Sequence, residues 1–174
     1  MTADAPISRA EADLAHALFE RHHAEVYAYL RRMVGDGALA EDLAQETFLC
    51  AFASRTGLAR VQNPRAWLYR VATNLALNAL KRRRRFAWLP WHPGAERQAA
   101  QPDPAEALGA HSAVEAALAA LPPELRAPLL LYACEGMSVA EVAEALALSE
   151  GAVKMRLHRA RRLFRQAYER EDVP

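Results

Sequence analysis

At 174 residues, with 52% apolar and 25% charged side chains, the chain has the length of one ordinary domain or two small ones and the balance of a globular protein. This composition excludes disorder throughout, and no run of about 18 uncharged apolar residues predicts a transmembrane helix. The N-terminal twenty residues carry acids where a signal peptide needs a cationic start, so we expect a cytoplasmic protein with no membrane insertion. The net charge of +1 by itself indicates no nucleic-acid partner.

The positive charges are clustered along the chain. Five consecutive cations occupy 81–85, and six more lie between 154 and 165. Two separated basic stretches predict two contacts on one polyanion. Cys50 and Cys134 lie far apart without a CxxC partner, so we predict buried, reduced thiols and neither a disulfide nor a metal site.

Apolar residues recur at a spacing close to 3.6, and no alternating strand pattern occurs, so we predict an all-α protein. The expected helices span 8–34, 38–54, 64–84, 111–120, 123–134, 138–146 and 149–169. Helix starts are indicated by Asn63 before Pro64, by the Ser138–Glu141 capping box and by Ser149. Residues 86–110 hold four of the ten prolines and lack a helical period, which predicts a flexible linker between two small helical domains, 8–85 and 111–170.

In the C-terminal half, a short helix, a tight break at "ALS" and a longer basic helix form the pattern of a helix-turn-helix. At 100° per residue, Val153, Leu157 and Ala160 share the apolar stripe of the second helix with Phe164 and Ala167. Small residues at its start would allow close approach to the major groove, and donors further along would reach bases and phosphates. The candidate residues for duplex DNA are Ser149, Gly151, Lys154, Met155, His158, Arg159 and Arg162. A solvated basic face on an ordinary helix is the alternative.

The helix that starts at Pro64 has a polar edge beside its apolar stripe. Trp67, Arg70, Asn74, Asn78 and Lys81 recur at spacings of three or four, and Arg82 to Arg85 extend the run of cations. Cations that track phosphates, amides that pair with base edges and an aromatic that stacks on bases favour single-stranded nucleic acid. A core-packed Trp67 with solvent-exposed asparagines is the alternative for this edge.

The helix over 38–54 has apolar residues on two sides. Leu43, Thr47 and Cys50 lie on one side, whereas Asp42, Gln45, Leu49 and Phe52 lie on the other. One side would face the core and the other a partner protein, with acceptors at its rim. The alternative is a fully enclosed central helix.

Three segments together resemble the extracytoplasmic-function (ECF, group 4) sigma factors of the bacterial sigma-70 family: "YAYLRRMVGDGALAEDLAQETFLCAF", "PRAWLYRVATNLALNALKRRRR" and "LPPELRAPLLLYACEGMSVAEVAEALALSEGAVKMRLHRARRLFR". The likeness covers about residues 14–168. It implies a region 2 domain, a linker that threads towards the polymerase active-site cleft, and a region 4 domain that reads the −35 element. The partners it implies are core RNA polymerase, through the β′ coiled coil and the β flap, promoter DNA and an anti-sigma factor; it implies no cofactor and no catalysis.

The resemblance also carries roles onto particular residues. Asp42, Gln45, Glu46 and Phe48 would dock on the β′ coiled coil, next to Leu49 and Phe52 from the two-sided pattern. Asn74 and Asn78 would face the melted non-template strand of the −10 element, with Tyr69 and Val71 as neighbours, and the loop 58–64 would capture a flipped base.

Some positions depart from the family pattern. Ala147 replaces a frequent Gly, Ala152 a frequent Thr, Met155 a common small polar residue, and Asn78 a frequent Asp. Base preference therefore does not transfer from relatives. Two other hypotheses are a dimeric helix-turn-helix regulator, which leaves the two-sided helix unexplained, and a nucleic-acid enzyme, for which no metal-spaced carboxylate cluster or phosphate-cradling loop is present.

Overall fold

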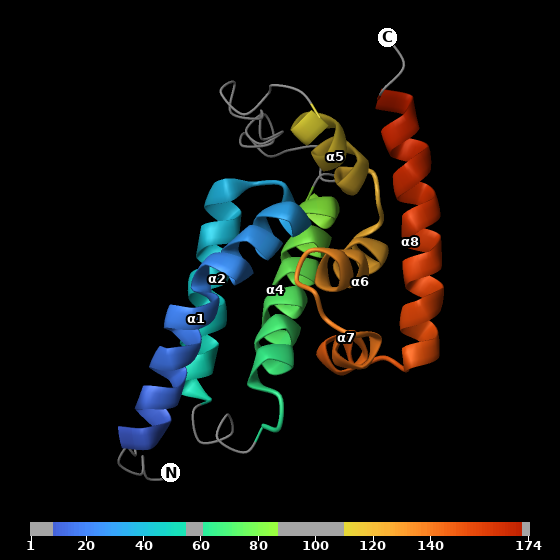
Figure 1. Cartoon of the computed structure of the whole chain (residues 1–174). Helices are drawn as coiled ribbons and strands as arrows, with labels where there is room; N and C mark the ends of the chain where they lie inside the picture. The colour runs from blue at the N-terminus through green and yellow to red at the C-terminus, as the bar shows by residue number, and fades with distance from the viewer. Residues whose placement is uncertain (1–8, 55–60, 87–109, 172–174) are drawn as a thin grey trace.

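Seven helices make up the regular structure of the part of the chain that the computed structural model describes, residues 9–54, 61–86 and 110–171 (Figure 1). They are α1 (Arg9–Val34), α2 (Gly37–Ala53), α4 (Pro64–Phe86), α5 (Ala110–Ala119), α6 (Pro123–Ala133), α7 (Val139–Leu146) and α8 (Glu150–Glu171). The all-α prediction is confirmed, and the predicted bounds differ from these by one or two residues. Of the predicted linker 86–110, Phe86 belongs to α4 and Ala110 to α5, and residues 87–109 lie outside the described residues.

Side-chain caps fix where several helices begin. The Asn63 side chain accepts from the Ala66 N–H (3.0 Å), and the Ser149 hydroxyl accepts from the Ala152 N–H (3.2 Å). The capping box is complete, since Ser138 accepts from the Glu141 N–H and donates its own N–H to the Glu141 carboxylate. Each cap supplies an acceptor to a helix N–H that has no partner within the helix. Asp36, which the sequence pattern placed only in a break, caps α2 through the Leu39 N–H at 3.1 Å.

The first three helices, α1, α2 and α4, pack on one another around large buried side chains. Tyr29 and Tyr69 meet edge to face, with ring centroids 5.3 Å apart. Thr73 donates to the Tyr69 carbonyl (2.6 Å), so the Tyr29 hydroxyl is left to donate to Thr73 at 2.7 Å. Burial raises the pKa of Tyr29. This hydroxyl chain satisfies the buried hydroxyl groups of Tyr29 and Thr73.

The other four helices form a second layer, in which α8 packs along α5, α6 and α7. Val153, Leu157 and Ala160 are buried, as the predicted apolar stripe requires. The two halves are also in contact with each other. In Figure 1, α4 lies between α1 and α2 on one side and α6 and α7 on the other, and buried residues of both halves belong to one apolar cluster.

The cysteines differ from the prediction. Cys50 is half-buried, but Cys134 is exposed, and it follows the last residue of α6 as the C-cap of that helix. Both are free thiols. No helix among the described residues has the length and apolar character needed to span a membrane.

Candidate nucleic-acid and polymerase interfaces

The polar edge of α4 is open to solvent. Arg70, Asn74, Asn78, Lys81 and Arg82 are exposed, whereas Trp67 and Val71 are half-buried. Trp67 is partly buried and packs against the apolar cluster. The alternative of a core-packed Trp67 is therefore correct for the buried part of its side chain. The two amides and the cations on either side of them therefore form one accessible strip along the helix. Of the loop predicted to capture a base, residues 58–60 lie outside the described residues.

Tyr69 does not belong to this exposed strip. It is fully buried, and its hydroxyl donates to the carboxylate of Glu135 in the turn after α6. Burial, followed by this hydrogen bond, raises the pKa of the tyrosine. The resemblance placed Tyr69 beside the strand-reading residues, but in this arrangement the second half of the protein covers it.

The five-cation run serves more than one purpose. Arg83 pairs with Asp36, the cap of α2, at 3.6 Å. Lys81, Arg82, Arg84 and Arg85 are exposed. The run therefore anchors the end of α4 through one side chain and presents its other cations to solvent.

The outer side of α2 carries exposed apolar groups among polar ones. Leu49 is 66% and Phe52 37% exposed, and Asp42, Gln45 and Glu46 are exposed beside them. An enclosed central helix is thus excluded. Phe48, which the resemblance assigned to the docking surface, is only 2% exposed and packs edge to face on Phe19, with centroids 5.1 Å apart. It supports the surface from beneath and cannot contact a partner without repacking.

The helix-turn-helix is formed by α7, a tight turn and α8. Ala147 in the turn has φ 52° and ψ 47°, the left-handed conformation that glycine adopts without strain. This geometry brings the Leu148 N–H to the Ala143 carbonyl at 2.9 Å and closes α7. The Gly that the resemblance led us to expect at this position would adopt this conformation without strain, and the alanine here accepts strain.

The recognition face predicted for α8 is exposed in full: Ser149, Gly151, Lys154, Met155, His158, Arg159 and Arg162. Met155 is 63% exposed although it is apolar. Lys154 forms a long ion pair with Glu150 (3.9 Å), in which both side chains are largely exposed and which contributes little to stability. The cations of this face are thus available to a polyanion.

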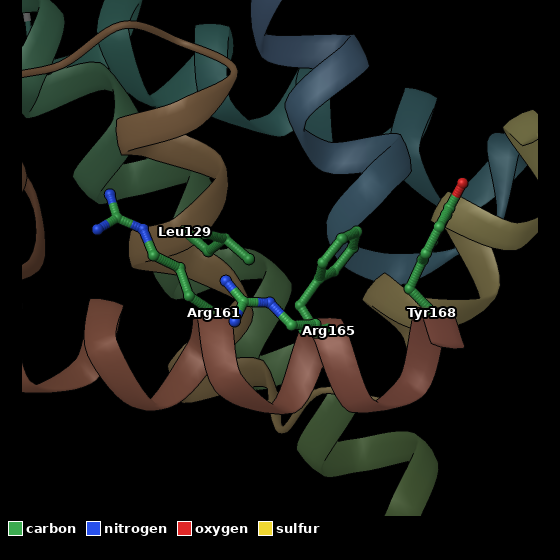
Figure 2. A pocket seen from close by; sticks show the side chains of 5 residues that line it. Leu129, Arg161, Arg165 and Tyr168 are labelled. Atoms are coloured by element: carbon green, nitrogen blue, oxygen red, sulfur yellow. The ribbon is translucent and has the colours of Figure 1, made fainter. Parts of the chain in front are cut away.

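A shallow groove of about 270 Å³ between α6 and α8 was not predicted from the sequence. Leu129, Phe164 and Tyr168 supply apolar groups to its lining. Arg161 and Arg165 also line it, and Figure 2 shows both projecting from α8. Arg161 also lies over the ring of Tyr132 at 5.1 Å. The helical periodicity had placed Phe164 in the apolar stripe of α8. Apart from their charge, nothing in the sequence indicated that Arg161 and Arg165 line a groove.

The polar contacts between the two halves were also missed. Arg65 on α4 donates to the Glu135 carbonyl, and Arg126 on α6 donates to the Met33 carbonyl at the end of α1. These pairs lie 70 and 93 residues apart in the sequence. No spacing pattern within one helix can reveal them.

Comparison with known proteins assigns each half to a family model. The model described as Sigma-70 region 2 matches residues 18–86, and the model described as Sigma-70, region 4 matches residues 111–164. The chain is 36% identical over 159 residues to the ECF RNA polymerase sigma factor SigL of Mycobacterium tuberculosis, and the match covers 90% of this chain and 89% of SigL. It is 34% identical to the RNA polymerase sigma factor CarQ of Myxococcus xanthus over 155 residues, 88% of each chain.

Other relatives match the chain over different shares of their own length. ECF RNA polymerase sigma factor SigE of Mycolicibacterium smegmatis is 36% identical over 159 residues, and the match covers 85% of this chain but 59% of SigE. Among solved structures, the sigma factor RpoE in complex with the anti-sigma factor NepR from Bartonella quintana aligns with a TM-score of 0.71 at 22% identity, over 90% of this chain and 97% of that one. CnrH in complex with the cytosolic domain of CnrY aligns with 0.68 at 24%, over 93% and 91%. At these identities the two structures show a shared fold.

Proposed function

The chain belongs to the sigma-70 family, in its extracytoplasmic-function group, and from this premise we propose that it directs core RNA polymerase to specific promoters and assists their opening. One observation supports the proposal above all. The exposed Asn strip of α4 and the exposed basic face of α8 lie on separate halves of one chain, as two contacts on promoter DNA require.

The outer side of α2 is the proposed docking surface for the β′ coiled coil. Leu49 and Phe52 supply apolar area, and Asp42, Gln45 and Glu46 supply acceptors for cations at the rim. Two exposed apolar side chains about one turn apart, with polar acceptors on the same side of the helix, suit a surface that a partner covers. The β flap is proposed to bind the second half, where the groove of Figure 2 offers apolar walls between two arginines.

The α4 strip is the proposed site for the melted non-template strand of the −10 element. Asn74 and Asn78 would hydrogen-bond to base edges, and Trp67 would stack on a base through its exposed part. Arg70, Lys81 and Arg82 would hold the phosphates. Melted bases expose the edges and faces that these groups bind, which is why the strip suits a single strand.

The α8 face is the proposed site for the duplex −35 element. Ser149 and Gly151 are small enough to let the start of the helix enter the major groove. Lys154, His158, Arg159 and Arg162 then supply donors to bases and phosphates. A dimeric regulator would use the same face, but it would leave the exposed Leu49 and the Asn strip without a role.

We further propose that the protein acts in the cytoplasm with the polymerase, without catalysis of its own, and that an anti-sigma factor controls it. Two solved structures with the same fold are complexes with NepR and with the cytosolic domain of CnrY, which supports the last point.

In vitro transcription with core polymerase, with and without the chain, over a promoter library tests the main proposal. We expect a set of start sites that depends on the added chain. If no start site depends on it, the proposed function is wrong. Specific binding to duplex promoter DNA as a stable dimer without polymerase would support the regulator instead.

A further inference from the structure

An apolar side chain interrupts the basic face of α8. Met155 is 63% exposed, and among the described residues of this helix it is the one large apolar side chain that is mostly open to solvent. The others are buried or half-buried. A single exposed apolar residue is common on protein surfaces and by itself indicates nothing. The informative feature is the place of Met155, near the start of a helix proposed to enter the major groove.

On the side of α8 that carries Met155, the preceding turn has no hydrogen-bonding side chain. The neighbours of Met155 one turn earlier are Gly151 and Ala152. The Ser149 hydroxyl oxygen, at the cap, already accepts from the Ala152 N–H at 3.2 Å. The surface beside Gly151 is open, since a Cβ at this position would meet only the Ser149 hydroxyl, at 4.0 Å. Because helical side chains lean towards the N-terminus of their helix, we expect Met155 to lie over this open space.

One turn later the same face becomes polar. His158 and Arg159 follow Met155 at spacings of three and four, and both are exposed. The recognition face therefore has an apolar start, formed by Gly151 and Met155, and a continuation whose donors suit phosphates and purine acceptors. Residues near the N-terminus of a recognition helix are the ones that contact base edges. The apolar start is thus the part of α8 that would face the bases.

The major groove offers such a surface one apolar group. Among the four bases only thymine carries a methyl group on its major-groove edge, at C5, and the other groups displayed there are hydrogen-bond donors and acceptors. A cytosine methylated at C5 presents the same methyl group at the same place. A donor or acceptor pressed against the Met155 thioether would lose its water without gaining a partner, which disfavours unmethylated base edges there.

We propose that Met155, above the open space at Gly151, reads the 5-methyl group of a pyrimidine in the −35 element, on thymine or on 5-methylcytosine. This inference rests on the proposed function, because that function places α8 in the major groove of the −35 element. It gives a base preference to a position where none transfers from relatives. Methylation of a cytosine at the contacted position would also raise the affinity for that promoter.

A cycle that removes the methyl group from the DNA and the thioether from the protein isolates this contact. The chain is combined with core polymerase on a promoter whose start site depends on it, and Kd is measured in the cold, before promoter opening. Each thymine of the −35 element is replaced in turn by uracil, on either strand. Met155→Gln has a similar size but is polar, and Met155→Leu stays apolar. Gln166→Ala is the control, because Gln166 is exposed on the same side of α8 about three turns further on.

At one thymine, uracil should raise the Kd of the parent by about 3- to 5-fold, the effect of withdrawing one buried methyl group. Met155→Gln should bind the thymine and uracil duplexes equally, whereas Met155→Leu and Gln166→Ala should keep the difference. At the same position, a C·G pair should bind about 3- to 5-fold more tightly when its cytosine carries the 5-methyl group. This gain should also disappear in Met155→Gln.

Three results would overturn the inference. The first is that no −35 position loses affinity when its methyl group is removed. The second is a methyl effect that persists in full in Met155→Gln, which would assign it to another residue. The third is a response to thymine without one to 5-methylcytosine, since the methyl group alone would then not be read. A chain-dependent promoter without a methyl effect overturns the inference only, whereas the absence of any chain-dependent start site overturns the proposed function and the inference with it.

Discussion

Replacing Ala147 with glycine should stabilise the protein. Ala147 is held in the left-handed region at φ 52°, where its Cβ crowds the backbone, and in the described residues it is the sole non-glycine residue with positive φ. The strain costs alanine about 1–2 kcal/mol, and glycine avoids it. Glycine loses about 0.5–1 kcal/mol more conformational freedom on folding, so the net gain should be about 0.5–1 kcal/mol.

Urea and thermal denaturation followed by circular dichroism measure this gain. For a chain of this size, 1 kcal/mol corresponds to a rise in Tm of about 2–4 °C. Ala24→Gly is the control, because Ala24 is exposed in the middle of α1, where the backbone is right-handed. There the same substitution should lower the free energy of unfolding by about 1 kcal/mol. If both variants lose stability alike, the left-handed turn before α8 is refuted.

Four further outcomes follow from the contacts described. The Ser138 N–H holds the pKa of Glu141 below its usual range. The carboxylate therefore stabilises the fold above its unfolded pKa of about 4.3, and this contribution disappears as the pH falls. Glu141→Gln should make the free energy of unfolding in urea less dependent on pH between about pH 5 and 3. Leu49→Ala should weaken core-polymerase binding by about 1–2 kcal/mol, roughly 5- to 30-fold in Kd, with Tm unchanged, as a binding titration would show. Asn74→Ala should impair promoter opening, seen by permanganate reactivity, while core binding is kept; loss of core binding would make its role structural. The exposed apolar side chain of Met155 suits a thymine methyl group, so Met155→Ala should weaken binding to a −35 duplex that contains thymine. Where the contacted thymine is replaced by uracil, which lacks the methyl group, the same substitution should cause no further loss of affinity.

Much of the helical fold could be predicted because its determinants are local. Periodicity fixes which face of α8 is buried, and Asn63, Ser138 and Ser149 mark helix starts through hydrogen bonds to residues three positions on. The tight break at "ALS" was predicted from the sequence, whereas the left-handed conformation of Ala147 comes from the structure alone.

The interfaces were less predictable where they depend on packing. A helical wheel places Phe48 at the border of two apolar sides of α2, and only the position of Phe19 on α1 decides that it is buried. Tyr69 is adjacent in sequence to exposed Arg70, yet the turn after α6 covers it. Arg126 had no sequence signal at all, since its acceptors are backbone carbonyls, which every residue has.

Asp36 links two helices with different proposed partners. One carboxylate oxygen caps α2 and the other faces Arg83 at the end of α4. A substitution there would release the first turn of α2, the proposed polymerase-docking helix, and the last turn of α4, the proposed strand-reading helix, at once. Genetic screens for defects in promoter melting and for defects in holoenzyme assembly should therefore recover the same alleles at this buried position, a pleiotropy that arises from shared anchoring and not from contact with either partner.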